Sequence, residues 1–263
     1  MTAVRDERDE AVRTALATVA DPELDEPITD LGFVRSVDFP DAQTVRVHLR
    51  LPTSFCSPNF AYLMASDAKD ALTGLDRFEW VIVELDDHHD SELINRGLAA
   101  DAGYLGTFGV EAEQSLDQLR LTFQRKAHNA AMERALTELL RREPDVPEAA
   151  LGQVRLGELP DTPAVSALRR RRAAIGLPDT PDALVLVDET GRGYPPEQVP
   201  LRLRLARSVR VSIDGNAHFC RGLLRTRYPD SAADQAPRRS GADDSRPLSL
   251  PLIPLEALKV NLS

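Results

Sequence analysis

A regular alternation of apolar and polar side chains over residues 44–51 constrains the fold of the N-terminal third of the chain. Every second residue is apolar, namely Val45, Val47, Leu49 and Leu51. A period of two is typical of a half-buried β-strand. A second strand candidate, Phe33 to Phe39, precedes this run across the turn-forming pair Pro40-Asp41. The two runs predict a β-hairpin.

Helical spacing flanks this hairpin on both sides. Residues 8–20 place Val12, Ala15, Leu16 and Val19 on one face, and Asp21-Pro22 ends that helix. Residues 59–72 repeat apolar side chains in the same way, with Asn59 as the expected N-cap and Gly74 as the stop. A third strand is expected at 78–85. The order helix, hairpin, helix, strand predicts a small α+β domain with a three-stranded sheet and two helices, over residues 1–92.

Residues 93–228 are expected to form a mainly helical extension that binds a client or partner. Helical spacing covers 116–139 and 164–174, whereas 183–187 and 209–213 suggest short strands. Residues 201–205 fit either a strand or a helix, and Asn216 is expected to cap a short helix through Leu224. Residues 229–263 begin with a Pro-, Ser- and Asp-rich stretch that predicts a disordered linker. The apolar tail at 248–262 is expected to dock.

Charge and composition exclude several classes of function. Residues 1–100 hold 20 acidic and 9 basic groups, which leaves 22 and 23 of the totals of 42 and 32. An acidic N-terminal domain repels phosphate backbones, so nucleic acid is not an expected partner. No apolar run approaches the roughly 20 residues that span a bilayer. A polar N-terminus and only two cysteines predict a cytoplasmic protein without membrane contact.

Cys56 is the most informative candidate site residue. It lies on a loop between a predicted strand and a predicted helix, where the positive end of the helix dipole favours a thiolate. The other cysteine, Cys220, shares helical spacing with Ala217 and Leu224, which favours a packing role. His218 would point to the opposite side of that helix, about 200° around its axis.

Two charged clusters have alternative interpretations. His88 and His89 lie among Asp86, Asp87 and Asp90, which suggests a divalent metal site, although a solvated loop is favoured because adjacent residues diverge on a strand. The basic run 169–172 suits an acidic client, the acidic N-terminal domain or a solvated helix face.

The run Asp-Pro-Glu-Leu-Asp-Glu-Pro-Ile-Thr-Asp-Leu-Gly-Phe-Val at 21–34, with the loop at 53–58, resembles the small domain of iron–sulfur cluster assembly factors. These include SufT-like proteins and accessory proteins of phenylacetate-type oxygenases. The resemblance covers residues 8–90 and implies an α+β fold that loads metal centres. Segments 115–127 and 211–224 look like the C-terminal extension of actinobacterial-type members, which the family context associates with binuclear-iron monooxygenases.

The resemblance carries four residues over to a cofactor-binding role. The family's Asp-Pro-Glu element falls on Asp21 and Glu23, and its Thr-x-x-Cys-Pro element falls on Thr53 and Cys56. Cys56 is the implied metal ligand, for iron or an iron–sulfur cluster bound transiently. The chain departs from the pattern at Cys56-Ser57-Pro58, where proline is displaced by one position.

One thiol falls short of the four ligands that a cluster usually takes, so a second protomer or a client would complete the site. We therefore expect a non-enzymatic metallocentre maturation factor whose client is a binuclear-iron monooxygenase component. The alternatives are a metal-independent folding chaperone or adaptor for an oxygenase subunit, and a thiol enzyme that uses Cys56 as its nucleophile. The last ranks lowest because no histidine is adjacent to Cys56 in the sequence.

Overall fold

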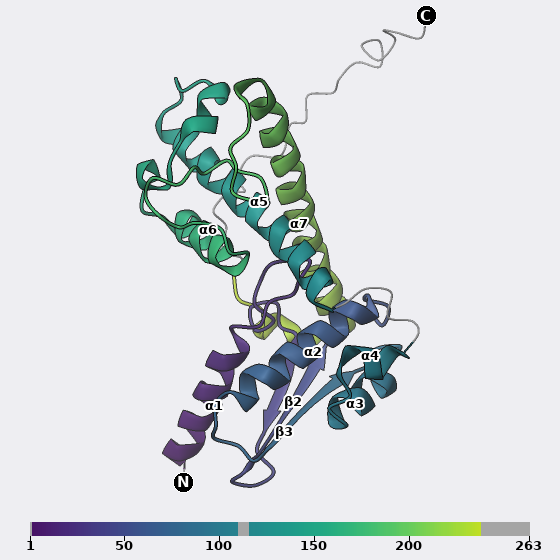
Figure 1. Ribbon diagram of the computed structural model, residues 1–263. Coiled ribbons are helices and arrows are strands. Elements are labelled where there is room, and N and C mark those ends of the chain that lie inside the picture. The colour runs from purple at the N-terminus through teal and green to yellow at the C-terminus, as the bar shows by residue number, and fades with distance from the viewer. Residues whose placement is uncertain (1, 110–115, 238–263) are drawn as a thin grey trace, which may run out of the picture.

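The computed structural model describes residues 2–109 and 116–237, and it has a sheet-containing part and a helical part (Figure 1). The N-terminal elements follow the predicted order. They are α1 (Thr2–Leu16), β1 (Val34–Asp38), β2 (Thr44–Arg50), α2 (Pro58–Thr73) and β3 (Trp80–Asp86). The predicted α+β fold, with a three-stranded sheet and two helices before a mainly helical extension, is confirmed.

The sheet has the order β1-β2-β3, so the strand with the clearest alternation lies at its centre. β1 pairs antiparallel with β2 as a hairpin, and β3 pairs parallel with β2 after the crossover through α2. Val45, Val47 and Leu49 are buried in a core shared with α1 and α2. The period of two in the sequence therefore reports a real difference between the two faces of β2.

Two short helices extend this core beyond residue 92. α3 (Ser91–Ala99) follows β3, and α4 (Gly103–Phe108) follows α3. Ile94, Leu98 and Tyr104 belong to the same buried cluster as the sheet. Figure 1 shows both helices beside α2 and β3.

The helical part contains three long helices and several single turns of 3-10 helix. The long helices are α5 (Leu116–Arg142), α6 (Pro163–Ala174) and α7 (Val199–Arg227), and the short turns are η2 (Glu148–Gln153), η3 (Leu156–Glu158), η4 (Pro196–Gln198) and η5 (Pro229–Ala233). A second buried cluster joins the three long helices to the loops at 151–156 and 185–186. No helix in the described ranges combines the length and the apolarity needed to cross a bilayer.

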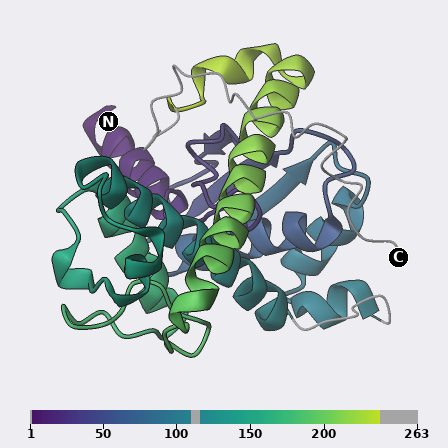
Figure 2. The same ribbon diagram turned by 90° about the horizontal axis from the view of Figure 1, so that it is seen from above.

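α7 belongs to both cores. Val199, Leu203 and Ala206 lie in the second cluster, whereas Ala217 and Leu224 lie in the first. Figure 2 shows α7 running from the helical part to the sheet. With a rise of about 1.5 Å per residue this helix is about 40 Å long, enough to connect the two parts.

Two predictions for the extension are wrong. Residues 209–213 are not a strand, and Asn216 does not begin a helix, because both lie inside the continuous α7. The buried residues of α7 recur at intervals of three, four or seven, which is helical spacing. At 183–187 only single bridges form, at Leu184 and Val187.

The prediction that a disordered linker begins at residue 229 is wrong. Residues 229–233 form η5, and the buried guanidinium of Arg50 pairs with Asp230 at 3.0 Å and with Asp234 at 2.5 Å. These contacts fix the chain after α7 against the end of β2. The apolar tail at 248–262 lies outside the described residues.

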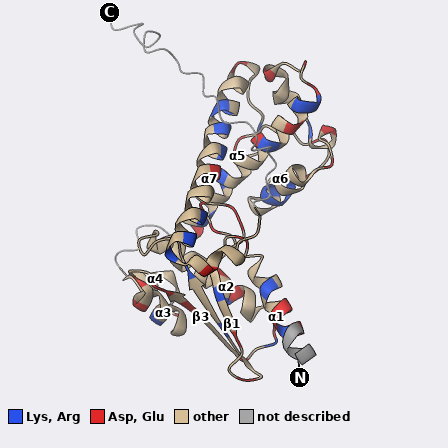
Figure 3. Ribbon diagram, turned by 180° about the vertical axis from the view of Figure 1, so that it is seen from behind, with Lys and Arg blue, Asp and Glu red and all other residues tan. Residues whose placement is uncertain are grey.

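Ion pairs join α6 and α7 to the N-terminal part. Figure 3 shows basic residues along both helices. Arg171 pairs with Asp25 of the N-terminal part at 2.5 Å, and Arg221 pairs with Glu26. The pair with Asp25 confirms, for Arg171, the interpretation that the basic run contacts the acidic N-terminal domain. Arg172 is instead buried and donates to two backbone carbonyls.

Candidate functional site

The loop between β2 and α2 carries Cys56 two residues before the helix begins. Ser57 is the N-cap residue and Pro58 occupies the first helical position, so the expectation that Asn59 is the N-cap is wrong. Proline suits that first position because its missing N–H would have no partner there and its φ is already helical. The displaced proline therefore keeps a regular helix start and leaves one residue between Cys56 and α2.

Thr53 contacts the thiol directly. Its Oγ1 lies 3.5 Å from the Sγ of Cys56 and accepts the N–H of Phe55 at 3.2 Å. Because the backbone N–H fills an acceptor position on that oxygen, the hydroxyl hydrogen is free to point at the sulfur. Thr53 and Cys56 are thus brought together, as the resemblance implies.

His88 anchors the same loop from the end of β3. Its Nε2 donates to the carbonyl oxygen of Cys56 at 2.8 Å, and its Nδ1 accepts the N–H of Asp90 at 3.1 Å. This assignment of the ring hydrogen follows from the two partners. The prediction of a solvated loop is wrong for His88, which is buried, and holds for the exposed His89.

Asp21 organises the neighbouring loop rather than presenting a free carboxylate. Its Oδ1 accepts the N–H groups of Glu23 and Leu24, each at 2.8 Å. Burial raises the pKa of Asp21 from 3.8 to about 6, although these two hydrogen bonds oppose the shift. Glu23 faces α7, where its Oε1 accepts the side-chain N–H of Asn216 at 3.2 Å.

α7 brings Cys220 to these two loops. One turn before Cys220, Asn216 bonds Glu23, and two turns after it Arg227 donates to the Leu51 carbonyl at 3.1 Å and to Ser54 Oγ at 2.8 Å. Cys220 and Cys56 both pack against the N-terminal core and are both partly exposed.

The charged groups near Cys220 include most of the predicted site residues. Burial, together with the smaller effect of the charges of Asp21, Cys56 and Glu23, raises its pKa to about 12. Three of the four predicted site residues thus lie within electrostatic range of Cys220, and the fourth, Thr53, touches Cys56. The helical spacing of Cys220 with Ala217 and Leu224 predicts only a packing role, because local spacing does not show which loops a helix faces.

These residues do not form a complete metal centre by themselves. Within the part of the chain that the structure describes, no three or more His, Cys, Asp or Glu side chains are placed to hold one metal ion. His218 is exposed on the far side of α7. The thiols can supply ligands to iron, but further ligands have to come from elsewhere.

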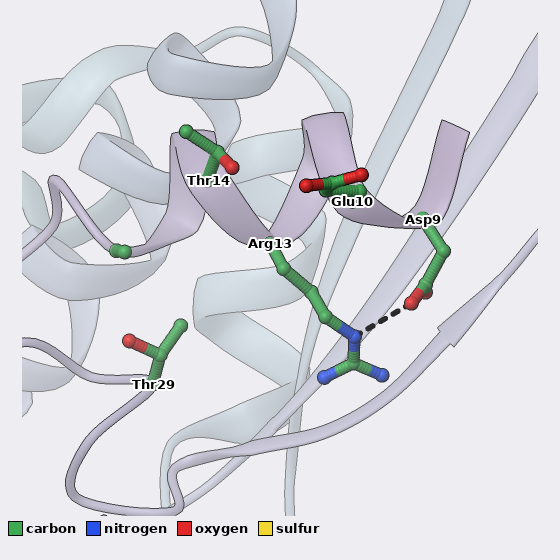
Figure 4. A pocket seen from close by; sticks show the side chains of 6 residues that line it. Asp9, Glu10, Arg13, Thr14 and Thr29 are labelled. Carbon is green, nitrogen blue, oxygen red and sulfur yellow. Dashed lines mark hydrogen bonds and ion pairs between the residues drawn. The ribbon is translucent and has the colours of Figure 1, made fainter. Parts of the chain in front are cut away.

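A separate hollow lies away from the thiols, between α1 and the loop at Thr29 (Figure 4). It has a volume of about 490 Å³ and is lined by Asp9, Glu10, Arg13 and Thr14. Arg13 pairs with Asp9 at 2.7 Å. None of the four predicted site residues lines it.

Comparison with known proteins identifies the N-terminal part. The family model "Iron-sulfur cluster assembly protein" matches residues 9–85. The protein MJ1129 of Methanocaldococcus jannaschii is 35% identical over 89 residues, which are 34% of this chain and 92% of that protein. The chain belongs to the iron–sulfur cluster assembly protein family.

A second relative is longer than this chain. An iron–sulfur cluster carrier protein of Mycobacterium leprae is 48% identical over 46 residues, or 18% of this chain and 12% of the carrier. The chain therefore matches only a small part of that protein. No solved structure matches the chain.

The family match includes some of the site and omits the rest. Asp21, Glu23, Thr53 and Cys56 all lie within residues 9–85. Cys220 and the helix that carries it lie outside the matched region. The contribution of α7 to the site is therefore a feature of this chain that the family match does not cover.

Proposed function

We propose that this chain is a maturation factor that uses Cys56 to hold iron or an iron–sulfur cluster in transit to a client protein. The observation that carries the proposal is the Thr53–Cys56 contact of 3.5 Å on an anchored loop of an iron–sulfur cluster assembly domain. A thiolate is the form of cysteine that binds iron, and the hydroxyl of Thr53 is placed to donate to it.

The loop suits transfer because it is fixed but accessible. His88 and Arg227 hold its backbone and Ser54, while Cys56 stays partly exposed. Phe55, next to the thiol, leaves 82% of its surface exposed and lies beside the ring of His89. An exposed aromatic side chain at such a position suits contact with another protein.

The extension supplies the client specificity in this proposal. The client is a binuclear-iron monooxygenase component, as the resemblance of segments 115–127 and 211–224 implies, and the two proteins meet in a reducing cytoplasm. The client or a second copy of this chain completes the ligand set, because a cluster usually needs four protein ligands.

Anaerobic reconstitution with Fe²⁺ and sulfide tests the proposal. We expect the full chain to bind iron and to develop sulfur-to-iron absorption in the visible range, and the Cys56→Ala variant to lose both. Ser57→Ala is the matched control, because the Ser57 side chain makes no capping hydrogen bond. A wild-type chain that binds no iron and shows no such absorption would favour the metal-independent chaperone, and iron binding that is equal in wild type and Cys56→Ala would contradict the role of Cys56.

The thiol-enzyme alternative finds no support at the sulfur. The nearby imidazole of His88 uses both ring nitrogens on backbone groups, one of them the Cys56 carbonyl. A nucleophilic cysteine needs a base within hydrogen-bond reach of its sulfur, and His88 does not act as one in this geometry.

A further inference from the structure

We propose that Cys220 is the second thiolate ligand of the Cys56 site, so that this chain supplies two of the ligands of the iron or cluster it carries. This inference rests on the proposed function, since it needs Cys56 to be a ligand. It replaces the single-thiol site expected from the sequence with a site formed between two loops of the N-terminal part and α7.

The spacing of residues along α7 places Cys220 on the face that contacts the N-terminal part. Buried positions recur at Val199, Leu203, Ala206, Ile213, Ala217, Arg221 and Leu224, and Arg210 between them pairs with the buried Glu133. Such spacing keeps one stripe of a helix against its neighbour. Cys220 flanks this stripe, where it is partly buried and packs against the N-terminal core.

The neighbours of Cys220 on the stripe fix where it lies. Ala217 and Leu224 are both fully buried in the N-terminal core. Leu224 also approaches Gly32, where an added Cβ would lie 3.4 Å from the Leu224 side chain. Cys220 lies between these two residues along the helix, and also between Asn216, which bonds Glu23, and Arg227, which bonds Ser54.

The chemistry around Cys220 suits a bound cation. Two carboxyl groups, those of Asp21 and Glu23, and the other thiol all lie within electrostatic range of it. Anionic groups attract a bound cation, and thiolates are soft ligands that suit iron.

Two thiolates leave the site open. A cluster usually takes four protein ligands, so two positions stay available to a client that receives it. An open coordination position is also what a transfer step needs, since the incoming ligands can bind before the outgoing ones leave. Cys220 as an inert packing residue would leave the site with one thiolate.

Titration of the apo chain with Co²⁺ tests the pair, because thiolate-to-cobalt absorption grows with the number of Co–S bonds. We expect the intensity per bound Co²⁺ to fall by about half in Cys220→Ala and in Cys56→Ala, since one of two soft ligands remains. Cys220→Ser is the second variant, because it preserves the side-chain size if alanine disturbs the packing. Thermal unfolding checks that each variant is folded.

A relocated thiol is the matched control. The double variant with Cys220→Ala and His218→Cys keeps two thiols, but the new one lies on the exposed side of α7. We expect it to give the same spectrum as Cys220→Ala alone.

The outcomes separate the two proposals. Wild-type intensity in folded Cys220→Ala and Cys220→Ser overturns the two-thiolate site and leaves the role of Cys56 intact. Wild-type intensity in Cys56→Ala overturns the proposed function, and this inference with it. A wild-type chain that binds no Co²⁺ through sulfur overturns both.

Discussion

Replacing Asp21 with asparagine removes a buried carboxyl group and keeps an acceptor for its two hydrogen bonds. Asn has a side-chain oxygen in the same position, so the N–H groups of Glu23 and Leu24 can remain bonded. Only the ionisation is lost. The variant therefore isolates the effect of burying this charge.

The pKa of Asp21 gives the magnitude. Burial raises it from 3.8 to about 6 in the folded chain. Each pKa unit corresponds to about 1.4 kcal/mol, so the ionised carboxyl lowers the free energy of unfolding by about 3 kcal/mol at pH 7. The folded state binds the proton more tightly, so wild-type stability is highest below pH 4 and falls until pH exceeds 6.

Urea unfolding at two pH values measures this effect. We expect Asp21→Asn to exceed wild type by about 1 kcal/mol at pH 4.5 and by about 3 kcal/mol at pH 7. The matched control is Asp145→Asn, at an exposed carboxyl group, which should follow the wild-type values. A stability difference between Asp21→Asn and wild type that is the same at both pH values would refute the reasoning.

Three further variants test the anchored loop and the α5–α7 contact. His88→Ala should lower the free energy of unfolding by about 1–3 kcal/mol, because the carbonyl of Cys56 loses its hydrogen-bond donor. The loosened loop should also speed the reaction of Cys56 with maleimide. Unchanged labelling would show that other contacts hold the loop. Thr53→Val should slow the same labelling, since the hydroxyl no longer stabilises the thiolate, and a faster reaction would contradict the assigned contact. Glu133→Gln should lower the free energy of unfolding by about 3–5 kcal/mol in urea, because two α7 arginines lose a buried counter-charge. The exposed Glu197→Gln is its control, and equal losses in both would argue against a special role for the buried pair.

The sheet could be predicted from the sequence because its signal is local. β2 alternates apolar and polar residues over its whole length, and Gly74 ends the helix that follows it, as predicted. Each of these elements is decided by neighbouring residues. The contacts within the Cys56 loop are also short-range, since Thr53 and Cys56 are only three positions apart.

Over a short window the sequence of α7 has the apolar and polar alternation of a strand, which leads to the wrong prediction for residues 209–213. Val209, Val211 and Ile213 alternate with polar residues, yet Val211 is 42% exposed and Ile213 only 7%. The polar Arg210 interrupts the apolar stripe, and it is tolerated there because it pairs with the buried Glu133 of α5. That partner lies 77 positions away, so no local pattern reveals it.

Long-range contacts also explain why the sequence predicts only a packing role for Cys220. Its approach to Cys56 depends on contacts such as Asn216 with Glu23, which are 193 positions apart. Helical spacing alone does not say which partner a stripe faces. The long-range ion pairs of α6 and α7 decide this, and they appear only in the folded chain.

Native mass spectrometry of the chain after anaerobic reconstitution with Fe²⁺ and sulfide tests the central claim most directly. It weighs the folded chain together with whatever iron and sulfide it holds, and it separates single copies from pairs. We predict iron-containing species for wild type and for Ser57→Ala, and none for Cys56→Ala. Iron and sulfide retained on folded Cys56→Ala at the wild-type level would contradict the account.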